Sequence, residues 1–201
     1  MKKIQMVDLK SQYEKIKDTV NSSIQEVLDT NAYINGPLVH LFQKNLEDYL
    51  GIKHVIPCAN GTDSLQIAMM ALDLKIGDEV ICPAFTYVAT AEVIGLLGLT
   101  PVMVDVDPYT FNITPLEIEK AITSKTKAIV PVHYTGYMTD MRKLLPIAKK
   151  YNLPVIEDAC QSILGAIDNK NAGTWGNTGA FSLHPLKNLN VWSDGGVIVT
   201  D

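Results

Sequence analysis

The first part of the chain carries the periodicity of α-helices. Between residues 12 and 28, apolar side chains recur every three or four positions, which places them on one face of a helix. Residues 30–37 interrupt this pattern with Asn, Gly and Pro, which are typical of turns. A second helix is predicted for residues 38–50 and is ended by Gly51. The chain is therefore predicted to begin with a pair of helices.

From residue 54 onwards, short apolar runs alternate regularly with helical segments. Strands are predicted at residues 54–59, 79–83, 101–106, 128–133 and 154–158, and helices at residues 65–72, 88–97, 115–122 and 141–151. Such alternation predicts the α/β fold class, with helices on both sides of a mostly parallel central sheet in a three-layer α/β/α arrangement. The runs at residues 80–82, 102–104 and 128–130 are continuously apolar, as expected for strands buried on both faces.

The pattern changes after Gln161. Four glycines are predicted to mark turns, namely Gly165, Gly173, Gly176 and Gly179. Two further strands are predicted, around residues 180–182 and at residues 197–199. Because the sequence stops directly on the second of these strands, we expect it to be part of a longer polypeptide.

The composition is that of a soluble globular protein with one domain. The 201 residues are 47% hydrophobic and 19% charged, with a net charge of −5 at pH 7, and contain no dense tract of Lys or Arg. This argues against binding to nucleic acid or to a membrane surface. The first residues lack the apolar core of a signal peptide, and the apolar run at residues 93–104 is too short to cross a bilayer. A cytoplasmic location is therefore expected.

The three cysteines give no functional signal of their own. Cys58, Cys82 and Cys160 are an odd number, lie in apolar surroundings and lack the spacing of metal ligands. We therefore interpret them as buried free thiols, and no metal site is expected.

Candidate chemistry lies where the predicted strands end. In a parallel α/β sheet, ligands bind beyond the carboxyl ends of the strands, and Thr62, residues 85–87, His133 and Asp158 all fall at such ends. The turn at residues 60–63 opens a helix, so its backbone amides suit a phosphate, although an ordinary helix cap explains the same residues. It is neither a P-loop nor a G-x-G-x-x-G turn.

Two aromatic rings follow the second predicted strand. Tyr87 is the better candidate for stacking on a planar cofactor, because its hydroxyl group suits a polar pocket. For Phe85, packing in the core is an equally good interpretation.

Asp158 and Lys187 together indicate a pyridoxal phosphate (PLP) site. Asp158 follows a buried strand, so its carboxylate needs a cationic partner, which the pyridine N–H of PLP supplies. The amine of Lys187 can hold the aldehyde of the cofactor as a Schiff base. Taken singly, residues 157–158 could begin a solvated loop, and Lys187 could be an ordinary surface lysine.

The neighbouring polar residues fit the same cofactor more weakly. Gln161 is a candidate for the hydrogen bond to the ring oxygen, and Ser182 for a contact with the phosphate. His133 and His184 are ambiguous, since histidines in such positions are more often structural than catalytic.

These segments, taken in order, resemble the DegT/DnrJ/StrS-type sugar aminotransferases over essentially the whole chain. The resemblance rests on residues 7–9, 34–37, 60–63, 83–91, 156–162, 181–188 and 195–196. It implies a fold-type-I PLP enzyme, a homodimer, that aminates a nucleotide-linked keto-sugar with an amino acid donor, commonly glutamate. Such amino-sugars enter cell-surface polysaccharides and secondary metabolites.

The resemblance also assigns roles to individual residues. It implies that Lys187 forms the Schiff base, that Asp158 pairs with the pyridine nitrogen, that Gln161 contacts the ring oxygen and that Tyr87 stacks on the ring. The implied phosphate cup consists of Gly61, Thr62, Asp63 and Ser182. Residues 1–201 would form the PLP-binding large domain, while a C-terminal small domain and a phosphate contact from the partner subunit lie outside this chain.

Two alternatives remain at this point. Some members of this group remove a sugar hydroxyl instead of transferring an amine, and they carry histidine at the lysine position, so Lys187 speaks against that reaction. A non-catalytic regulatory protein with the same fold is the other alternative, and Lys187, Asp158 and Gln161 disfavour it.

Overall fold

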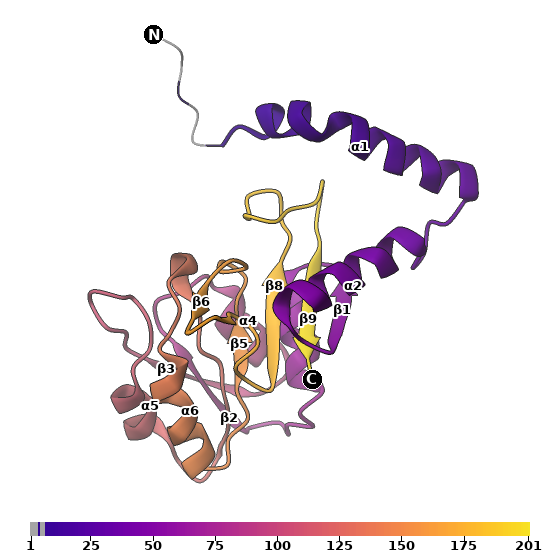
Figure 1. Cartoon of the computed structure of the whole chain (residues 1–201). Coiled ribbons are helices and arrows are strands. Elements are labelled where there is room, and N and C mark those ends of the chain that lie inside the picture. Colours follow the sequence, from indigo (N-terminus) through magenta and orange to yellow (C-terminus); the bar gives the residue numbers. More distant parts are fainter. Residues whose placement is uncertain (1–3, 5–6) are drawn as a thin grey trace. The chain divides into compact units, whose positions relative to one another are not determined.

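The computed structural model describes residue 4 and residues 7–201 (Figure 1), in two compact units, residues 1–46 and 47–201. Helix α1 (Leu9–Thr30) lies in the first unit, and helix α2 (Pro37–Leu50) begins there. Both predicted helices are confirmed. Helix α1 begins earlier than predicted because the Asp8 side chain accepts a hydrogen bond from the Ser11 N–H at 3.0 Å, which caps the helix.

The second unit is built on a mostly parallel sheet, as predicted. Its strands are β1 (His54–Cys58), β2 (Glu79–Pro83), β3 (Thr100–Val104), β4 (Thr126–Ile129), β5 (Ile156–Asp158), β8 (Thr178–Ser182) and β9 (Gly196–Thr200). One group has the order β3-β2-β4 and the other β5-β8-β9-β1. Parallel bridges from Ile129 to Val155 and from Val132 to Asp158 join the two groups. Among these strands, β9 runs antiparallel to both its neighbours and the others run parallel.

The strand order also determines which helix covers which face. The helices are α3 (Gly61–Met70), α4 (Ala89–Leu96), α5 (Pro115–Ala121) and α6 (Met141–Lys150). From β1 through β2 to β3 the chain moves across the sheet in one direction, and from β3 through β4 to β5 it returns. Because parallel crossovers are right-handed, α3 and α4 lie on one face and α5 and α6 on the other. The packing agrees, since α3 packs against α4 and α5 packs against α6.

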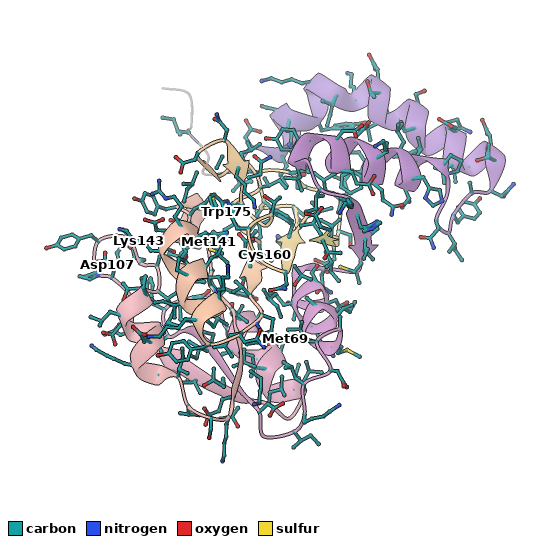
Figure 2. All side chains as sticks on the ribbon, turned by 60° about the horizontal axis from the view of Figure 1, so that its bottom comes forward. Met69, Asp107, Met141, Lys143, Cys160 and Trp175 are labelled. Atoms are coloured by element: carbon teal, nitrogen blue, oxygen red, sulfur yellow. The ribbon has the colours of Figure 1, made fainter. Side chains whose placement is uncertain are left out.

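The core lies on both sides of the central strands. Met69 of α3 and Met141 of α6 are fully buried, whereas Lys143 is exposed (Figure 2). The apolar run of β2 at residues 80–82 and the run at residues 128–130, which begins in β4, are also completely buried, as predicted.

Two predictions about this region are wrong. Strand β3 is not buried on both faces, because it forms the edge of the sheet, and Met103 is 59% exposed. Gly179 does not mark a turn but lies within β8, where an added Cβ would collide with the backbone of Gly173.

A short hairpin of β6 (Ala166–Ile167) and β7 (Lys170–Asn171) was not predicted, because two-residue strands carry no periodicity. None of the helices in the described part of the chain is long and apolar enough to span a membrane.

Candidate active site

The predicted site residues lie at one edge of the sheet because the parallel strands end there. Helix α3 begins at Gly61 after β1, and α4 begins at Ala89 after β2. Asp158 is the last residue of β5, and Ser182 is the last residue of β8. The loop between β8 and β9 carries Lys187. Residues from distant parts of the sequence are thus brought to the edge at which α/β sheets bind ligands.

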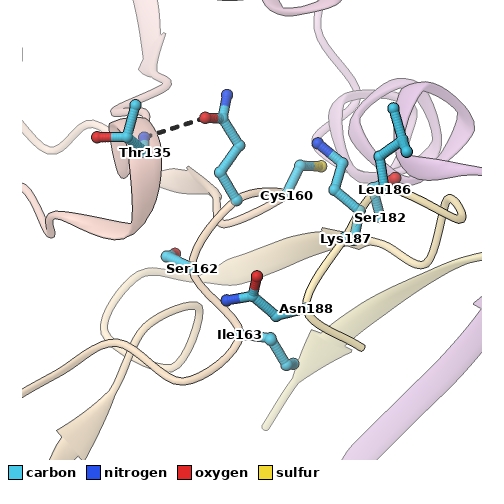
Figure 3. Close-up of a pocket in the computed structure, with 9 residues that line it drawn as sticks. Thr135, Cys160, Ser162, Ile163, Ser182, Leu186, Lys187 and Asn188 are labelled. Atoms are coloured by element: carbon cyan, nitrogen blue, oxygen red, sulfur yellow. Dashed lines mark hydrogen bonds between the residues drawn. The ribbon is translucent and has the colours of Figure 1, made fainter. Parts of the chain in front are cut away.

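A pocket of about 260 Å³ lies at this edge (Figure 3). It is lined by Thr135, Cys160, Gln161, Ser162, Ile163, Ser182, Leu186, Lys187 and Asn188. Three of the predicted site residues, Gln161, Ser182 and Lys187, therefore share one cavity.

The backbone of the β8–β9 loop holds Lys187 at the pocket. The Lys187 N–H donates to the carbonyl of His184 at 2.8 Å, and the Asn190 side chain donates to the Lys187 carbonyl at 3.1 Å. The Lys187 side chain extends toward Cys160 (Figure 3). Burial raises the pKa of the Cys160 thiol well above its ordinary value and the negative charge of Asp158 adds to this rise, whereas the positive charge of Lys187 opposes it. An amine and a carboxylate thus act on the same thiol.

The orientation of Gln161 follows from its partner. The Thr135 N–H donates to Gln161 Oε1 at 3.0 Å, shown as the dashed line in Figure 3. Because this end of the amide accepts, the other end, Nε2, is the one that can donate to a ligand. Thr135 makes this contact from the left-handed backbone region, with φ of 54°, a conformation that costs energy for a β-branched residue.

Asp158 is buried and both oxygens of its carboxylate accept hydrogen bonds. The side chain is held by the Thr90 hydroxyl, which donates to Oδ2 at 2.8 Å, and by the Cys160 N–H, which donates to Oδ1 at 3.2 Å. The backbone of Asp158 pairs with Pro131 and His133 of the neighbouring chain segment. The alternative that residues 157–158 begin a solvated loop is therefore wrong, since both side chains are buried.

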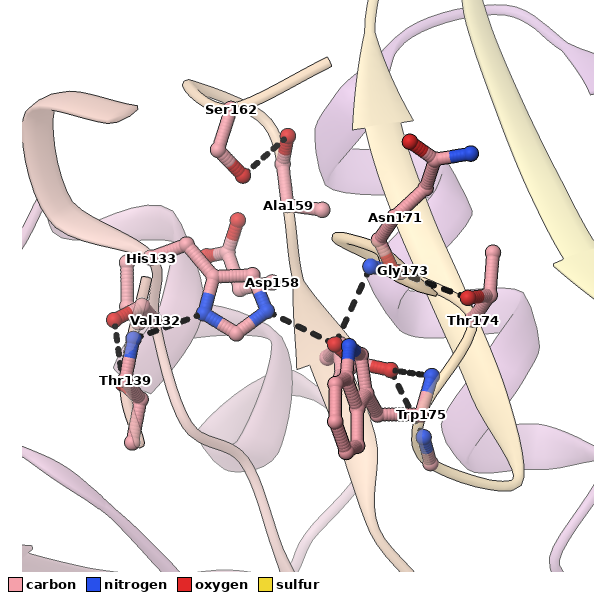
Figure 4. Close-up of polar contacts among 12 residues, drawn as sticks. Val132, His133, Thr139, Asp158, Ala159, Ser162, Asn171, Gly173, Thr174 and Trp175 are labelled. Atoms are coloured by element: carbon pink, nitrogen blue, oxygen red, sulfur yellow. Dashed lines mark hydrogen bonds and ion pairs between the residues drawn. The ribbon is translucent and has the colours of Figure 1, made fainter. Parts of the chain in front are cut away.

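Glu157 forms a separate buried network that the sequence did not reveal (Figure 4). Its Oε2 accepts hydrogen bonds from His133 Nε2 at 2.7 Å and from the Gly173 N–H at 3.0 Å, and its Oε1 accepts from the N–H groups of Trp175 and Gly176, each at 2.6 Å. The Thr139 N–H donates to His133 Nδ1, so the ring proton lies on Nε2 and points to Glu157. His133 is thus structural, which settles one of the two ambiguous histidines.

The turn before α3 is a helix cap that lies against the wall of the pocket. Asn60 Oδ1 accepts a hydrogen bond from the Asp63 N–H at 2.8 Å, so this amide is engaged in the cap. The amides of Gly61 and Thr62 belong to the first helical turn, where N–H groups have no acceptor within the helix. A Cβ on Gly61 would lie 2.7 Å from Ser182 Cβ and 2.9 Å from Cys160 Sγ. Only glycine allows this helix end to lie so close to the pocket wall.

Ser182 and His184 complete the wall on the β8 side. The Ser182 hydroxyl accepts a hydrogen bond from the His184 N–H at 3.3 Å, which leaves the hydroxyl proton available for a ligand. The exposed His184 accepts from the Leu186 N–H through Nδ1 and thereby shapes the turn that precedes Lys187. The phosphate contacts predicted for Gly61, Thr62, Asp63 and Ser182 stay predictions.

The two candidate aromatic rings have different surroundings. The Phe85 ring contacts Phe111 and Tyr134, with centroid distances of 5.4 and 5.1 Å, but Phe85 is 48% exposed, so its interpretation as a core residue is wrong. Tyr87 is 69% exposed and is not among the residues that line the pocket. Its stacking on a cofactor stays a prediction.

The interpretation of the cysteines needs correction. Cys82 is buried as predicted, and burial raises the pKa of its thiol to about 12. Cys58 and Cys160 are only partly buried. Cys58 Sγ lies 2.9 Å from Ser64 Oγ, and Cys160 lines the pocket together with Gln161. Cys160 is therefore a pocket residue that was not predicted, although its neighbours in the sequence, Asp158, Gln161 and Ser162, are polar.

Known proteins resemble this chain over nearly its whole length. It is 48% identical to UDP-2-acetamido-2-deoxy-3-oxo-D-glucuronate aminotransferase from Pseudomonas aeruginosa, covering 98% of this chain and 55% of the relative. It is 43% identical to a pleiotropic regulatory protein from Geobacillus stearothermophilus, covering 98% and 53%. The chain thus spans about half the length of the curated relatives it matches.

Solved structures agree with this similarity. The fold matches an aminotransferase from Brucella abortus with a TM-score of 0.95 at 41% identity, covering 98% of this chain and 55% of that structure. It also matches NtdA from Bacillus subtilis, determined with the bound cofactor PMP, with a TM-score of 0.90 at 38% identity, covering 100% and 46%. The family model for these enzymes matches residues 14–201. The chain belongs to the DegT/DnrJ/EryC1/StrS aminotransferase family.

Proposed function

We propose that residues 1–201 form the PLP-binding large domain of an aminotransferase that converts a nucleotide-linked keto-sugar to an amino-sugar. The proposed amino donor is an amino acid, glutamate. The observation that carries the proposal is the shared pocket of Gln161, Ser182 and Lys187 beside the buried carboxylate of Asp158. The P. aeruginosa relative, named as a UDP-sugar aminotransferase, and the PMP-bound structure of NtdA support the same substrate class and cofactor.

The residues of the pocket fit the functional groups of PLP. The amine of Lys187 would hold the aldehyde, and the Nε2 group of Gln161 would donate to the ring oxygen. The Asp158 carboxylate would accept from the pyridine N–H, which offsets the cost of burying its charge. The phosphate would lie at the first turn of α3, which Gly61 brings against Ser182 without a side chain between them.

PLP, when bound, supplies an electron sink that stabilises negative charge on the carbon being deprotonated. Lys187 Nζ takes the proton from the α carbon of the amino donor. In the second half of the reaction it delivers a proton to the former carbonyl carbon of the sugar. Asp158 keeps the ring nitrogen protonated, and Gln161 orients the ring by its hydrogen bond. The net reaction exchanges the amine of glutamate for the oxygen of the keto-sugar and yields 2-oxoglutarate.

A homodimer is part of the proposal. Val88, just before α4, has an apolar side chain that is 63% exposed. A second copy would cover it and would bring its own residues to the edge of the sheet that carries the pocket. Mass photometry of the complete protein, wild type and with Val88→Glu, tests this part, because the charged side chain should dissociate a dimer that buries Val88.

The experiment that tests the cofactor assignment uses the complete protein and PLP. Borohydride reduction should fix the cofactor to one peptide, and mass spectrometry should place it on Lys187. Lys187→Ala should abolish the label, whereas the exposed Lys170→Ala should retain it. A label elsewhere, or none, would contradict the assignment.

Turnover separates the aminotransferase from its alternatives. The complete protein is mixed with glutamate and a panel of nucleotide-linked 3-keto and 4-keto sugars, and NMR identifies the position of the new amine. Loss of the visible cofactor absorbance on adding glutamate, followed by formation of an amino-sugar, is the expected result. Loss of a sugar hydroxyl without amine transfer would instead indicate a dehydratase.

A regulatory role is the second candidate, because the G. stearothermophilus relative is named as a pleiotropic regulatory protein. The pocket does not favour it, since Lys187 and Gln161 both line the cavity in positions suited to a cofactor. A protein that binds PLP at Lys187 but never exchanges amines with glutamate would support this candidate over the enzyme.

A further inference from the structure

Thr90 makes a buried contact with the carboxylate of Asp158. It lies in the first turn of α4 and is completely buried. Its Oγ1 donates to Asp158 Oδ2 at 2.8 Å, while the other oxygen of that carboxylate accepts from the Cys160 N–H at 3.2 Å. The first contact joins α4 to β5, and the second comes from the turn that follows β5 itself.

The single proton of the Thr90 hydroxyl has one preferred acceptor. Its oxygen lies 3.3 Å from the Tyr87 carbonyl and 3.4 Å from Thr86 Oγ1, both longer than the 2.8 Å to Asp158. The carboxylate is also the charged acceptor of the three, and hydrogen bonds to charged groups are stronger. Thr86 can donate to Thr90 in turn. A threonine in a helix has two common χ1 rotamers, and the 2.8 Å contact with Asp158 holds Thr90 in the one that directs its hydroxyl to the carboxylate.

These contacts restrict how the Asp158 carboxylate can rotate. Each oxygen is held by a donor from a different segment, so turning the group about its Cβ–Cγ bond breaks both hydrogen bonds. A carboxylate oxygen has two lone pairs, and the ones that Thr90 and Cys160 leave unused can accept from a ligand. The direction in which Asp158 would meet a ring N–H is thus set in part by Thr90 of helix α4.

We propose that Thr90 is a positioning residue, whose hydroxyl group orients the Asp158 carboxylate toward the pyridine nitrogen of PLP. This inference rests on the proposed function. Thr90 itself touches neither substrate nor cofactor in this scheme. Its effect reaches the reaction through Asp158, and it ties the start of α4, which follows Tyr87, to the end of β5.

The test compares Thr90→Val with Thr90→Ser in the complete protein loaded with PLP. Valine keeps the shape and removes the donor, so kcat for the glutamate half-reaction should fall about tenfold or more, the effect of losing one hydrogen bond to a charged group. The KM for glutamate should stay within about twofold, because the residues that bind the amino donor are unchanged. The pH titration of the visible cofactor absorbance should shift. Serine restores the hydroxyl, so it should return kcat to within about threefold of wild type and should restore the cofactor titration.

Thr139→Val is the matched control. Thr139 is also buried, and its hydroxyl donates to the Val132 carbonyl at 3.1 Å instead of to Asp158. It should lower the melting temperature without shifting the cofactor titration. The inference is overturned if Thr90→Val behaves as wild type, if serine fails to rescue it, or if Thr139→Val produces the same spectral shift.

The wild-type protein separates this inference from the proposed function. If borohydride fixes no PLP on Lys187 of the wild type, the proposed function fails and the role of Thr90 fails with it. If Lys187 is labelled and Thr90→Val leaves kcat and the titration unchanged, the role of Thr90 alone is wrong.

Discussion

Replacing Glu157 by glutamine should destabilise the fold strongly, although the two side chains have nearly the same shape. Each oxygen of Glu157 accepts two hydrogen bonds, and the side chain is completely buried. Glutamine replaces one of these oxygens by an NH2 group, which cannot accept. In either orientation, two donors lose their acceptor and face another donor. His133 cannot adapt by moving its proton, because its Nδ1 already accepts from the Thr139 N–H.

The magnitude follows from the two hydrogen bonds that the substitution breaks. A hydrogen bond to a charged group contributes about 1.5–3 kcal/mol, so two of them amount to about 3–6 kcal/mol. We therefore expect Glu157→Gln to lower the free energy of unfolding by about 4 kcal/mol, a large share of the roughly 5–15 kcal/mol typical of a domain.

Urea unfolding of the complete protein at neutral pH, followed by tryptophan fluorescence, measures this loss as a lower midpoint at an unchanged slope. Glu117→Gln is the matched control, because its carboxylate pairs with Lys120 at the surface. Surface ion pairs contribute at most about 1 kcal/mol. A Glu157→Gln protein within about 1 kcal/mol of wild type would refute the reasoning.

Three further predictions concern other parts of the second unit. Gly179→Ala should lower the free energy of unfolding by about 3 kcal/mol, because its Cβ meets the backbone of Gly173. Gly95→Ala lies in open space on α4 and should raise the free energy of unfolding by about 0.5–1 kcal/mol. Equal urea midpoints for the two variants would contradict both expectations. Burial raises the pKa of Cys82 to about 12 from 9.0, so its thiol contributes stability that is complete below pH 9 and is lost as the pH rises toward 12. The free energy of unfolding of the wild type should therefore fall by up to about 1.4 kcal/mol per pH unit relative to that of Cys82→Ala over that range. Parallel curves of unfolding free energy against pH for the two proteins would disprove this. Thr135→Gly should raise the free energy of unfolding by up to about 1 kcal/mol by relieving the left-handed backbone, and a lower melting temperature would count against that strain.

The sequence predicted the helices and most strands because periodicity is a local property. The apolar spacing in residues 12–28 identifies α1 without reference to the rest of the chain. The run at residues 80–82 likewise identifies β2, and its complete burial follows from its place between two other strands. The carboxyl ends of the parallel strands then place Asp158 and Ser182 at one edge, so a large part of the site could also be predicted.

What the sequence could not predict depends on how distant segments meet. The run at residues 102–104 is as apolar as its neighbours, but only the strand order shows that it lies at the edge of the sheet. The direction of β9 depends on its pairing with β8 and β1. Cys160 becomes part of the pocket only because the loop that carries Lys187 returns beside it. None of these relations leaves a periodic signal in the sequence.

Glu157 and Asp158 illustrate this limit within two positions. Both are acidic and both follow the same apolar strand, so their sequence signals are equivalent. Successive side chains of a strand point to opposite faces, and the two carboxylates therefore meet different partners. Glu157 accepts from the backbone of residues 173–176 and holds that loop to the sheet, whereas Asp158 accepts from the Thr90 hydroxyl and the Cys160 N–H. The buried acid with the most hydrogen bonds is thus a structural one, and its neighbour is the one proposed to meet the cofactor.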